Sequence, residues 1–463
     1  MTRVINFFQQ IGFNEEQANA IINLLKISKN LQRDVFFQDL EMLKMHFERP
    51  ENNDQARKFK EIERSKSDED EINLENFFNN EIYSDENIRD YLIFATQKLF
   101  GRNAFQERNE ITKQDWLESN FQDIKKILDE LGMTQAKKSA FKDPDYSFIF
   151  GAAFGRIYLR CKSLVNEIAA QEISKEHQKY LVCGSRAINL EEISLDDGCK
   201  KYQINRKSVD WSSVAGNDEF EKLMEEFEAS DLFKNYAQLA IAEEQEAARL
   251  LTIGTPNEIK IQRLKGEQVI GEFIATKISN ESKIEIQLLE DHVIAEGEIR
   301  GTTKTNAQRI LDKIFQDQTD KSSDSQSKKI LLVFNNPHSQ RMCMDFKNAI
   351  KENHEKYKLN LDVSYMGEGM ENPTMAAISE VPSLVLAKFK NFLIEKEIGQ
   401  EKLLDPDKFD KIITELQFKN HGSMRIHQAE STPVLPQREL SPRLSPRGVS
   451  DKAISYVASS MSK

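Results

Sequence analysis

Short apolar runs separated by helix-forming stretches dominate the middle of the chain, and they constrain its fold more than any other feature. Residues 147–150 and 180–183 are apolar runs typical of buried strands, and residues 156–173 between them carry apolar side chains at helical spacing. A strand, a helix and a second strand at this spacing form a βαβ unit, whose two strands run parallel. The sequence therefore predicts a Rossmann-like α/β domain, built on a parallel sheet, over residues 141–420.

The same alternation of strand and helix signals continues along the chain. The further strands expected from apolar alternation or apolar runs span residues 259–264, 284–289, 329–334 and 361–365. The further helices expected from helical periodicity span residues 236–252, 304–316, 339–352, 376–396 and 406–417. Of these elements, the run at 329–334 is the strongest strand signal in the chain.

The two ends of the chain differ from the middle, and from each other, in composition and apolar periodicity. Residues 1–140 are predicted to be an all-helical N-terminal region, with helical periodicity over 4–27, 31–48, 86–100 and 113–131. Residues 421–463 are rich in Ser, Pro and Arg without apolar periodicity, which predicts a disordered tail. The expected organisation is therefore a helical region, an α/β domain from 141 to 420, and a tail.

Composition excludes several classes of function. The net charge of −12 argues against a nucleic-acid partner, because binding to phosphate backbones needs a positive surface. The N-terminus does not resemble a signal peptide, and no window approaches the roughly 18 apolar residues of a membrane span, so a cytoplasmic protein is expected. The 4 cysteines are scattered without a Cys-x-x-Cys pair, which favours reduced thiols over a zinc site or disulfide framework.

Small residues follow the first two predicted strands. Gly151 and Ala152 come directly after residues 147–150, and Gly184 with Ser185 comes directly after residues 180–183. Ligands of open parallel sheets bind beyond the carboxyl ends of the strands, where small residues let backbone N–H groups approach an anionic group. These four residues are therefore predicted to bind a ligand. The simpler alternative is that each glycine only makes a turn.

Polar side chains follow at two later turns. Thr303 and Asn306 open the helix expected at 304–316, and His338 and Arg341 open the helix that follows the strongest strand. A histidine can transfer a proton near neutral pH and an arginine can bind a phosphate or carboxylate, so His338 is the candidate catalytic residue and Arg341 a candidate ligand anchor. The alternatives are a helix N-cap at the threonine and an ordinary surface pair at the second turn.

In this order, the motifs resemble the YdcF-like (ElyC/SanA/YdcF) family over about 280 residues. Besides the four turns above, of which the last reads Pro337-His338-x-x-Arg341, the resemblance includes an acidic helix start at Glu243 or Glu244 and the Gly254-Thr-Pro256 segment. The chain carries Thr305 where the family has a glutamate. The resemblance implies a Rossmann-like fold with an anionic or nucleotide-type ligand, and S-adenosylmethionine is the cofactor associated with some members.

Two functions are therefore carried forward. The first is a cytoplasmic YdcF-like protein that binds S-adenosylmethionine or a related nucleotide or anionic ligand at the carboxyl edge of the sheet, where it would act as a transferase or hydrolase. The second is a non-catalytic interaction or scaffold protein that binds a protein partner through residues 1–140 or the tail. The sequence leaves open whether the chain is an enzyme.

Overall fold

The described elements of the structure, a computed structural model, form two compact units, each drawn from separate stretches of the chain. One, here called the helical unit, takes its elements from residues before 136, from 336–352 and from 380–398; the other, the sheet unit, takes its elements from between 136 and 335 and from 353–368. The domain boundaries at 140 and 420 remain predictions. The described residues are 2–43, 71–78, 83–100, 119–152, 154–184, 217–238, 266–289, 303–319, 327–369, 378 and 380–398.

The described elements of the helical unit are all helices. They are α1 (Arg3–Gln10), α2 (Glu15–Ile27), α3 (Arg33–Met42), α5 (Leu74–Phe78), α6 (Asp85–Phe100), α8 (Phe121–Glu130), α16 (Ser339–Glu352) and α19 (Glu380–Ile398). The expected helices at 86–100 and 339–352 are thus present, whereas the segments 44–70 and 101–118 lie outside the described residues. No helix in the described part of the chain is long and apolar enough to cross a bilayer.

The segment 4–27, expected to be helical throughout, forms two helices that meet at a turn. Gly12 has a φ of 92°, in the left-handed region that side chains disfavour, so the chain turns there. Asn14 then caps α2, because its Oδ1 accepts from the Gln17 amide at 2.8 Å while the Gln17 side chain accepts from the Asn14 amide at 3.2 Å. This capping box starts α2 independently of α1.

Aromatic side chains fill the core of the helical unit. The ring of Phe36 lies 4.6 Å from that of Phe77 and 4.9 Å from that of Tyr91, centroid to centroid. The late helix α19 belongs to the same core, since Phe389 lies 6.4 Å from Phe7 and is buried. Residues nearly 400 positions apart therefore share one hydrophobic cluster.

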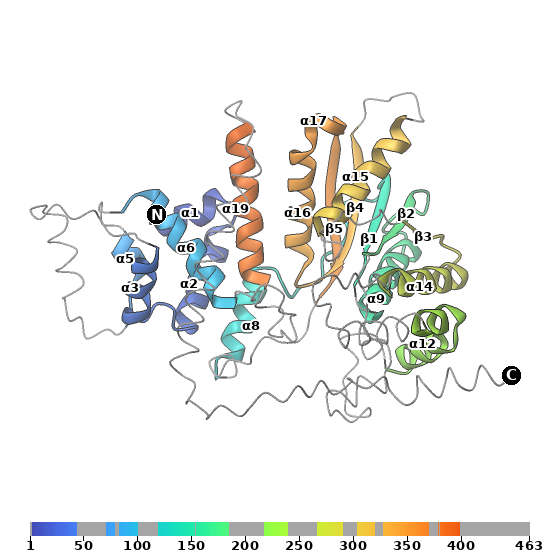
Figure 1. The fold of residues 1–463 in the computed structure, drawn as a ribbon, viewed down its shortest axis with the longest axis horizontal. Helices are drawn as coiled ribbons and strands as arrows, with labels where there is room; N and C mark the ends of the chain where they lie inside the picture. The colour runs from blue at the N-terminus through green and yellow to red at the C-terminus, as the bar shows by residue number, and fades with distance from the viewer. Residues whose placement is uncertain are drawn as a thin grey trace, which may run out of the picture. The chain divides into compact units, whose positions relative to one another are not determined.

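Five parallel strands form the sheet unit, in the order β3-β2-β1-β4-β5 (Figure 1). Their bounds are β1 (Tyr146–Phe150), β2 (Gln178–Val182), β3 (Gln287–Leu288), β4 (Lys328–Asn335) and β5 (Leu361–Glu368). The predicted Rossmann-like α/β fold is confirmed. In this order the chain reverses direction across the sheet between β1 and β4, the place where ligands of such sheets bind.

Helices pack against both faces of the sheet. The helices of this unit are α9 (Phe154–Ala169), α12 (Asn217–Ala229), α14 (Gly266–Ser282), α15 (Thr303–Thr319) and α17 (His354–Tyr357). Ile149 and Leu331 share a cluster with apolar residues of α9, α12 and α14. On the other face, Tyr146 donates to Asp317 of α15 at 3.3 Å, and Lys313 of α15 lies over the Tyr180 ring. The sheet core is thus covered on both sides, as parallel sheets require.

The region expected to be rich in strands before residue 300 is mostly helical where it is described. Helix α14 was not expected, and only Gln287–Leu288 within the predicted strand 284–289 is extended and paired. Val269, Ile270, Phe273 and Ile274 repeat at helical spacing and pack against α9, which explains the helix. The strand expected at 259–264, most of the helix expected at 236–252 and the helix expected at 406–417 lie outside the described residues.

A histidine in the loop before β2 is bonded to β1. The Nδ1 of His177 lies 2.7 Å from the Ser174 carbonyl, which can only accept, so Nδ1 carries the proton. The Nε2 atom lies 2.7 Å from the Ser147 hydroxyl and accepts from it. Burial, followed by the charge of Lys179, lowers the pKa of His177 to about 4, so the folded protein holds this ring neutral.

We expect His177 to make the protein less stable in mild acid. An unfolded histidine has a pKa near 6.5, so the unfolded chain binds a proton that the folded chain refuses as pH falls from about 6.5 to about 4. The contribution of the neutral ring to the free energy of unfolding is therefore fully present above about pH 6.5 and is lost progressively as the pH falls towards 4. Urea unfolding at several pH values should show a flatter profile for His177→Gln in this window, whereas a variant of the exposed His354, His354→Gln, should follow the wild type. Parallel profiles for His177→Gln and wild type would contradict this account.

Candidate functional site

Three of the four predicted turns belong to the sheet unit and follow the carboxyl ends of its strands. Gly151 and Ala152 follow β1, Gly184 follows β2, and the helix that contains Thr303 and Asn306 begins after β3. Because the strands are parallel, all these turns lie at one edge of the sheet. The side chain of Thr303, and all of Ser185, lie outside what the structure describes.

A buried glutamate that the sequence analysis missed joins the two glycine turns. Glu267 lies in the first turn of α14 and is 8% exposed. Its Oε1 accepts a hydrogen bond from the Gly184 amide at 3.1 Å. A helix N-terminus also favours a negative charge, so α14 holds this carboxylate where β2 ends. The expected acidic helix start at Glu243 or Glu244 lies outside the described residues.

Gly151 leaves the space that this carboxylate occupies. A Cβ atom built on Gly151 would stand 1.8 Å from the Glu267 Oε1 and 2.9 Å from the Cys183 Cα. The Gly151 amide donates to the Val182 carbonyl at 2.7 Å. Both glycine amides therefore donate to groups of the protein itself, and their role as a cradle for a ligand remains a prediction.

A buried arginine holds the turn after β1 in place. Arg160 of α9 is 2% exposed, and its Nη1 donates to the Phe150 carbonyl at 2.5 Å and to the Gly151 carbonyl at 2.9 Å. Its Nε donates to the Asn335 side chain at the end of β4. One guanidinium thus connects the carboxyl ends of the two strands between which the chain reverses direction.

This arginine lies in surroundings that are short of negative charge. Burial, followed by the positive charge of Arg156, lowers the pKa of Arg160 to about 9, and the carboxylate of Glu267 opposes both effects. Burial, followed by the charge of Glu267, also raises the pKa of the Cys183 thiol well above its usual range. Cys183 is therefore a protonated packing residue rather than a nucleophile.

Asn306 orients a second buried arginine. Arg309 of α15 donates to the Cys183 carbonyl after β2 and to the Leu289 carbonyl after β3, both at 2.7 Å, and to the Asn306 Oδ1 at 3.2 Å. Asn306 is itself 9% exposed. The structure thus gives this predicted ligand residue a partner within the protein, and that partner joins two strand ends.

His338 and Arg341 lie together in the helical unit, around a carboxylate that the sequence analysis also missed. Glu380, at the start of α19, is fully buried. Its Oε1 lies 3.2 Å from the His338 Nδ1, and its Oε2 lies 2.6 Å from the Arg341 Nε. Arg341 also bonds Asp345 at 2.8 Å. Burial raises the pKa of Asp345, while Arg341 opposes that rise.

Two of the buried charged residues that the sequence analysis missed, Arg160 and Glu380, stand at sequence positions that could have indicated them. Arg160 is a charged residue on the apolar face of a helix, between Ile157 and Leu164, and a charge in that position must find buried partners. Glu380 stands two residues before Pro382, at a typical helix start. Glu267 gave no comparable signal, because the helix that carries it was not predicted.

A large groove opens at the opposite, amino edge of the sheet. It has a volume of about 1340 Å³, and Tyr146, Tyr180 and Lys328 contribute to its wall. Two of its lysines pair with carboxylates of the same wall, Lys328 with Asp145 at 3.0 Å and Lys175 with Glu176 at 3.9 Å. We place the candidate site at the carboxyl edge instead, because the glycine turns and the buried Glu267 lie there. Among the described residues, no group of three His, Cys, Asp or Glu side chains could hold a metal ion.

Comparison with protein-family models, with curated proteins and with solved structures found no match to this chain. The assignment of a function therefore depends on the geometry described above.

We expect Gly151→Ala to destabilise the protein by about 1–3 kcal/mol, the usual cost of forcing extra atoms into a packed site. The cause is the overlap of the new Cβ with the Glu267 carboxylate and the Cys183 backbone. Gly184→Ala is the matched control, because a Cβ there would lie 3.5 Å from the nearest Glu267 oxygen, and it should change stability by less than about 1 kcal/mol. Urea unfolding measures both, and equal effects would contradict the close approach at Gly151.

We expect Glu380→Gln to destabilise the protein by about 3–5 kcal/mol, because it removes the buried carboxylate that the partly buried Arg341 and the buried His338 share. Glu395→Gln on the same helix removes a carboxylate that is 58% exposed and bonded to Lys351, so its cost should be about 1 kcal/mol or less. The free energies of unfolding in urea distinguish the two. A cost near that of Glu395→Gln would show that the Glu380 cluster is not a structural ion pair.

Proposed function

We propose that the sheet unit binds a ribose-bearing nucleoside cofactor at the carboxyl edge of its sheet, and that S-adenosylmethionine is the first candidate. The observation that carries the proposal is the buried Glu267 carboxylate between the glycine turns of β1 and β2. In dinucleotide-binding sheets of this kind, an acidic residue near this edge accepts hydrogen bonds from the ribose hydroxyls. The resemblance to the YdcF-like family and a cytoplasmic location belong to the same proposal.

The sign of this charge favours one ligand class among those expected. A carboxylate accepts from hydroxyl groups and attracts cations, whereas it repels a phosphate placed against it. S-Adenosylmethionine offers a ribose diol and a positively charged sulfonium, so it suits Glu267 better than a sugar phosphate does. In this proposal Gly151 leaves room for the carboxylate, the Gly184 amide donates to it, and Arg160 fixes the turn that the ligand meets.

We do not extend the proposal to a particular reaction. His338, the candidate acid or base, is 4% exposed, and its Nδ1 lies 3.2 Å from the buried Glu380 carboxylate, so this ring has little room to meet a ligand. Arg341 is committed to Glu380 and Asp345 in the same way. These contacts support a structural role for both residues and favour ligand binding over transferase or hydrolase chemistry.

The second candidate function is a scaffold that binds a protein partner. The same contacts support it, because Arg341 is bonded to the Glu380 carboxylate and His338 lies 3.2 Å from it. In that case the sheet unit would keep its fold without binding a nucleoside, and residues 1–140 or the tail would carry the interaction.

Ligand-induced stabilisation of the full chain distinguishes the two functions. A ligand present at 100 times its dissociation constant should stabilise the native state by about 2.7 kcal/mol. We expect S-adenosylmethionine and adenosine to raise the melting temperature. 2′,3′-Dideoxyadenosine, which lacks the ribose hydroxyls, should bind at least about tenfold more weakly, because a hydrogen bond to a charged group is lost.

Two variants of α14 test the residue itself. Glu267→Gln should weaken adenosine binding about tenfold or more, because the neutral amide is a poorer acceptor for hydroxyl groups. Glu272→Gln, which removes an exposed carboxylate from the same helix, should leave binding unchanged. If none of these nucleosides stabilises the wild type, the scaffold function is favoured instead.

A further inference from the structure

A second site, unconnected with the proposed nucleoside site, lies within the helical unit. A pocket of about 220 Å³, open to solvent on one side, lies between α1, α6 and α19, and it is lined by Arg3, Asn6, Phe7, Gln10, Asp85, Ile88, Arg89, Phe392 and Lys396. An apolar cavity of about 150 Å³ is large enough to bind benzene. The pocket therefore has room for a ring and a small charged group together, although it is smaller than a site for a drug-sized ligand.

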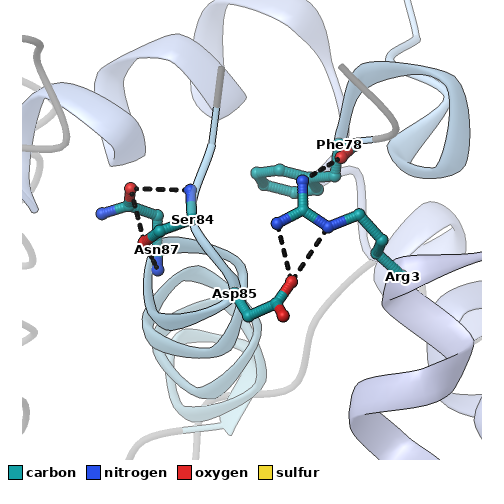
Figure 2. Close-up of polar contacts among 5 residues, drawn as sticks. All are labelled: Arg3, Phe78, Ser84, Asp85 and Asn87. Atoms are coloured by element: carbon teal, nitrogen blue, oxygen red, sulfur yellow. Dashed lines mark hydrogen bonds and ion pairs between the residues drawn. The ribbon is translucent and has the colours of Figure 1, made fainter. Parts of the chain in front are cut away.

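One wall of the pocket is a fixed arginine. The Nε and Nη2 atoms of Arg3 donate to the Asp85 Oδ1 at 2.9 and 2.6 Å, and the Nη1 atom donates to the Phe78 carbonyl at 3.2 Å. Figure 2 shows this guanidinium between α6 and the end of α5. Ser84 and Asn87 cap the first turn of α6 beside it, since the Asn87 amide donates to the Ser84 hydroxyl at 3.1 Å. The capped turn holds Asp85 in position for Arg3.

The charges around the pocket are unequal. Arg3, Arg89 and Lys396 line it, against the single carboxylate of Asp85. Asp90 bonds Arg89 at 2.8 Å, which leaves one positive charge in excess within the cluster. Asp85 is bonded to Arg3, and Asp90 to the Nε and Nη2 atoms of Arg89, so an incoming anion would meet Lys396 and the Nη1 atom of Arg89.

The rest of the lining is apolar and aromatic. Phe7 and Ile88 are buried, and the Phe392 ring lies 4.5 Å from the Lys396 Nζ. Arg89 lies in the same way over the Phe389 ring, 5.9 Å from its centre. Cations held over aromatic rings keep their charge near an apolar wall. A ligand that fits such a wall has both an anionic group and an apolar part.

We propose that this pocket binds a small organic anion, a carboxylate or phosphate monoester on an aromatic or apolar arm. Arg89 and Lys396 bind the anionic group, Phe7, Ile88 and Phe392 contact the arm, and Arg3 shapes the wall. The amides of Asn6 and Gln10 add hydrogen-bonding groups at the rim. The site draws on α1, α6 and α19, so binding of such an anion also stabilises the contact between the start of the chain and its last described helix.

Isothermal titration of the full chain at low salt, with phenyl phosphate as the probe, tests the proposal. Phenyl phosphate should bind at least about tenfold more tightly than inorganic phosphate, which lacks the arm, and than benzyl alcohol, which lacks the charge. Its affinity should fall as salt is raised, because partly exposed charges are screened. Absence of binding, or equal binding of either partial probe, would overturn the proposal.

Two double variants provide the matched comparison. Arg89→Gln with Lys396→Gln should weaken phenyl phosphate binding at least about tenfold while the protein stays folded, as checked by circular dichroism and urea unfolding. Arg33→Gln with Lys126→Gln removes the same charge from the same unit outside the pocket, where Lys126 is 77% exposed, and should leave the affinity unchanged. Equal losses in both pairs would mean a general charge effect and would overturn the site. Glu267→Gln should not alter this binding, which separates it from the nucleoside site.

Discussion

The Glu267 carboxylate determines both the packing of the glycine turns and the charge at the carboxyl edge of the sheet. Its charge is buried, and it accepts from the Gly184 amide while filling the space beside Gly151. A buried carboxylate needs hydrogen-bond donors around it, and a helix start and a backbone amide supply them here. Neither turn can therefore be considered apart from α14, although that helix lies more than 80 residues further along the chain than Gly184.

The two units use opposite means to hold a buried cation. In the sheet unit, Arg160 and Arg309 are surrounded by backbone carbonyls and by the amides of Asn335 and Asn306. Carbonyl dipoles orient a guanidinium without neutralising it, and burial, followed by the charge of Arg156, lowers the pKa of Arg160. In the helical unit, Arg341 meets two carboxylates instead. The first arrangement joins strand ends through their backbone carbonyls, whereas the second forms an ion-pair network within the helical unit.

The fold was more predictable from the sequence than the site. The strand at 329–334 and the helix at 304–316 could be predicted from local patterns. A buried strand appears in the sequence as a short apolar run, and an amphipathic helix appears as apolar residues at helical spacing. The α14 helix was missed because the segments on either side of it, residues 259–264 and 284–289, alternate apolar and polar side chains as strands do. The site could not be predicted in the same way. The partners of Gly151 and His338 are Glu267 and Glu380, and no local pattern connects residues so far apart in the chain.

The chain passes between the two units more than once, because α16 and α19 follow β4 and β5 in sequence but belong to the helical unit. Cutting the chain once near residue 136 would remove α1 to α8 and strip α19 of the neighbours that cover Phe389 and Leu384. The helical unit therefore depends on stretches from both ends of the polypeptide, and a truncation near residue 136 would leave apolar side chains of α19 open to water.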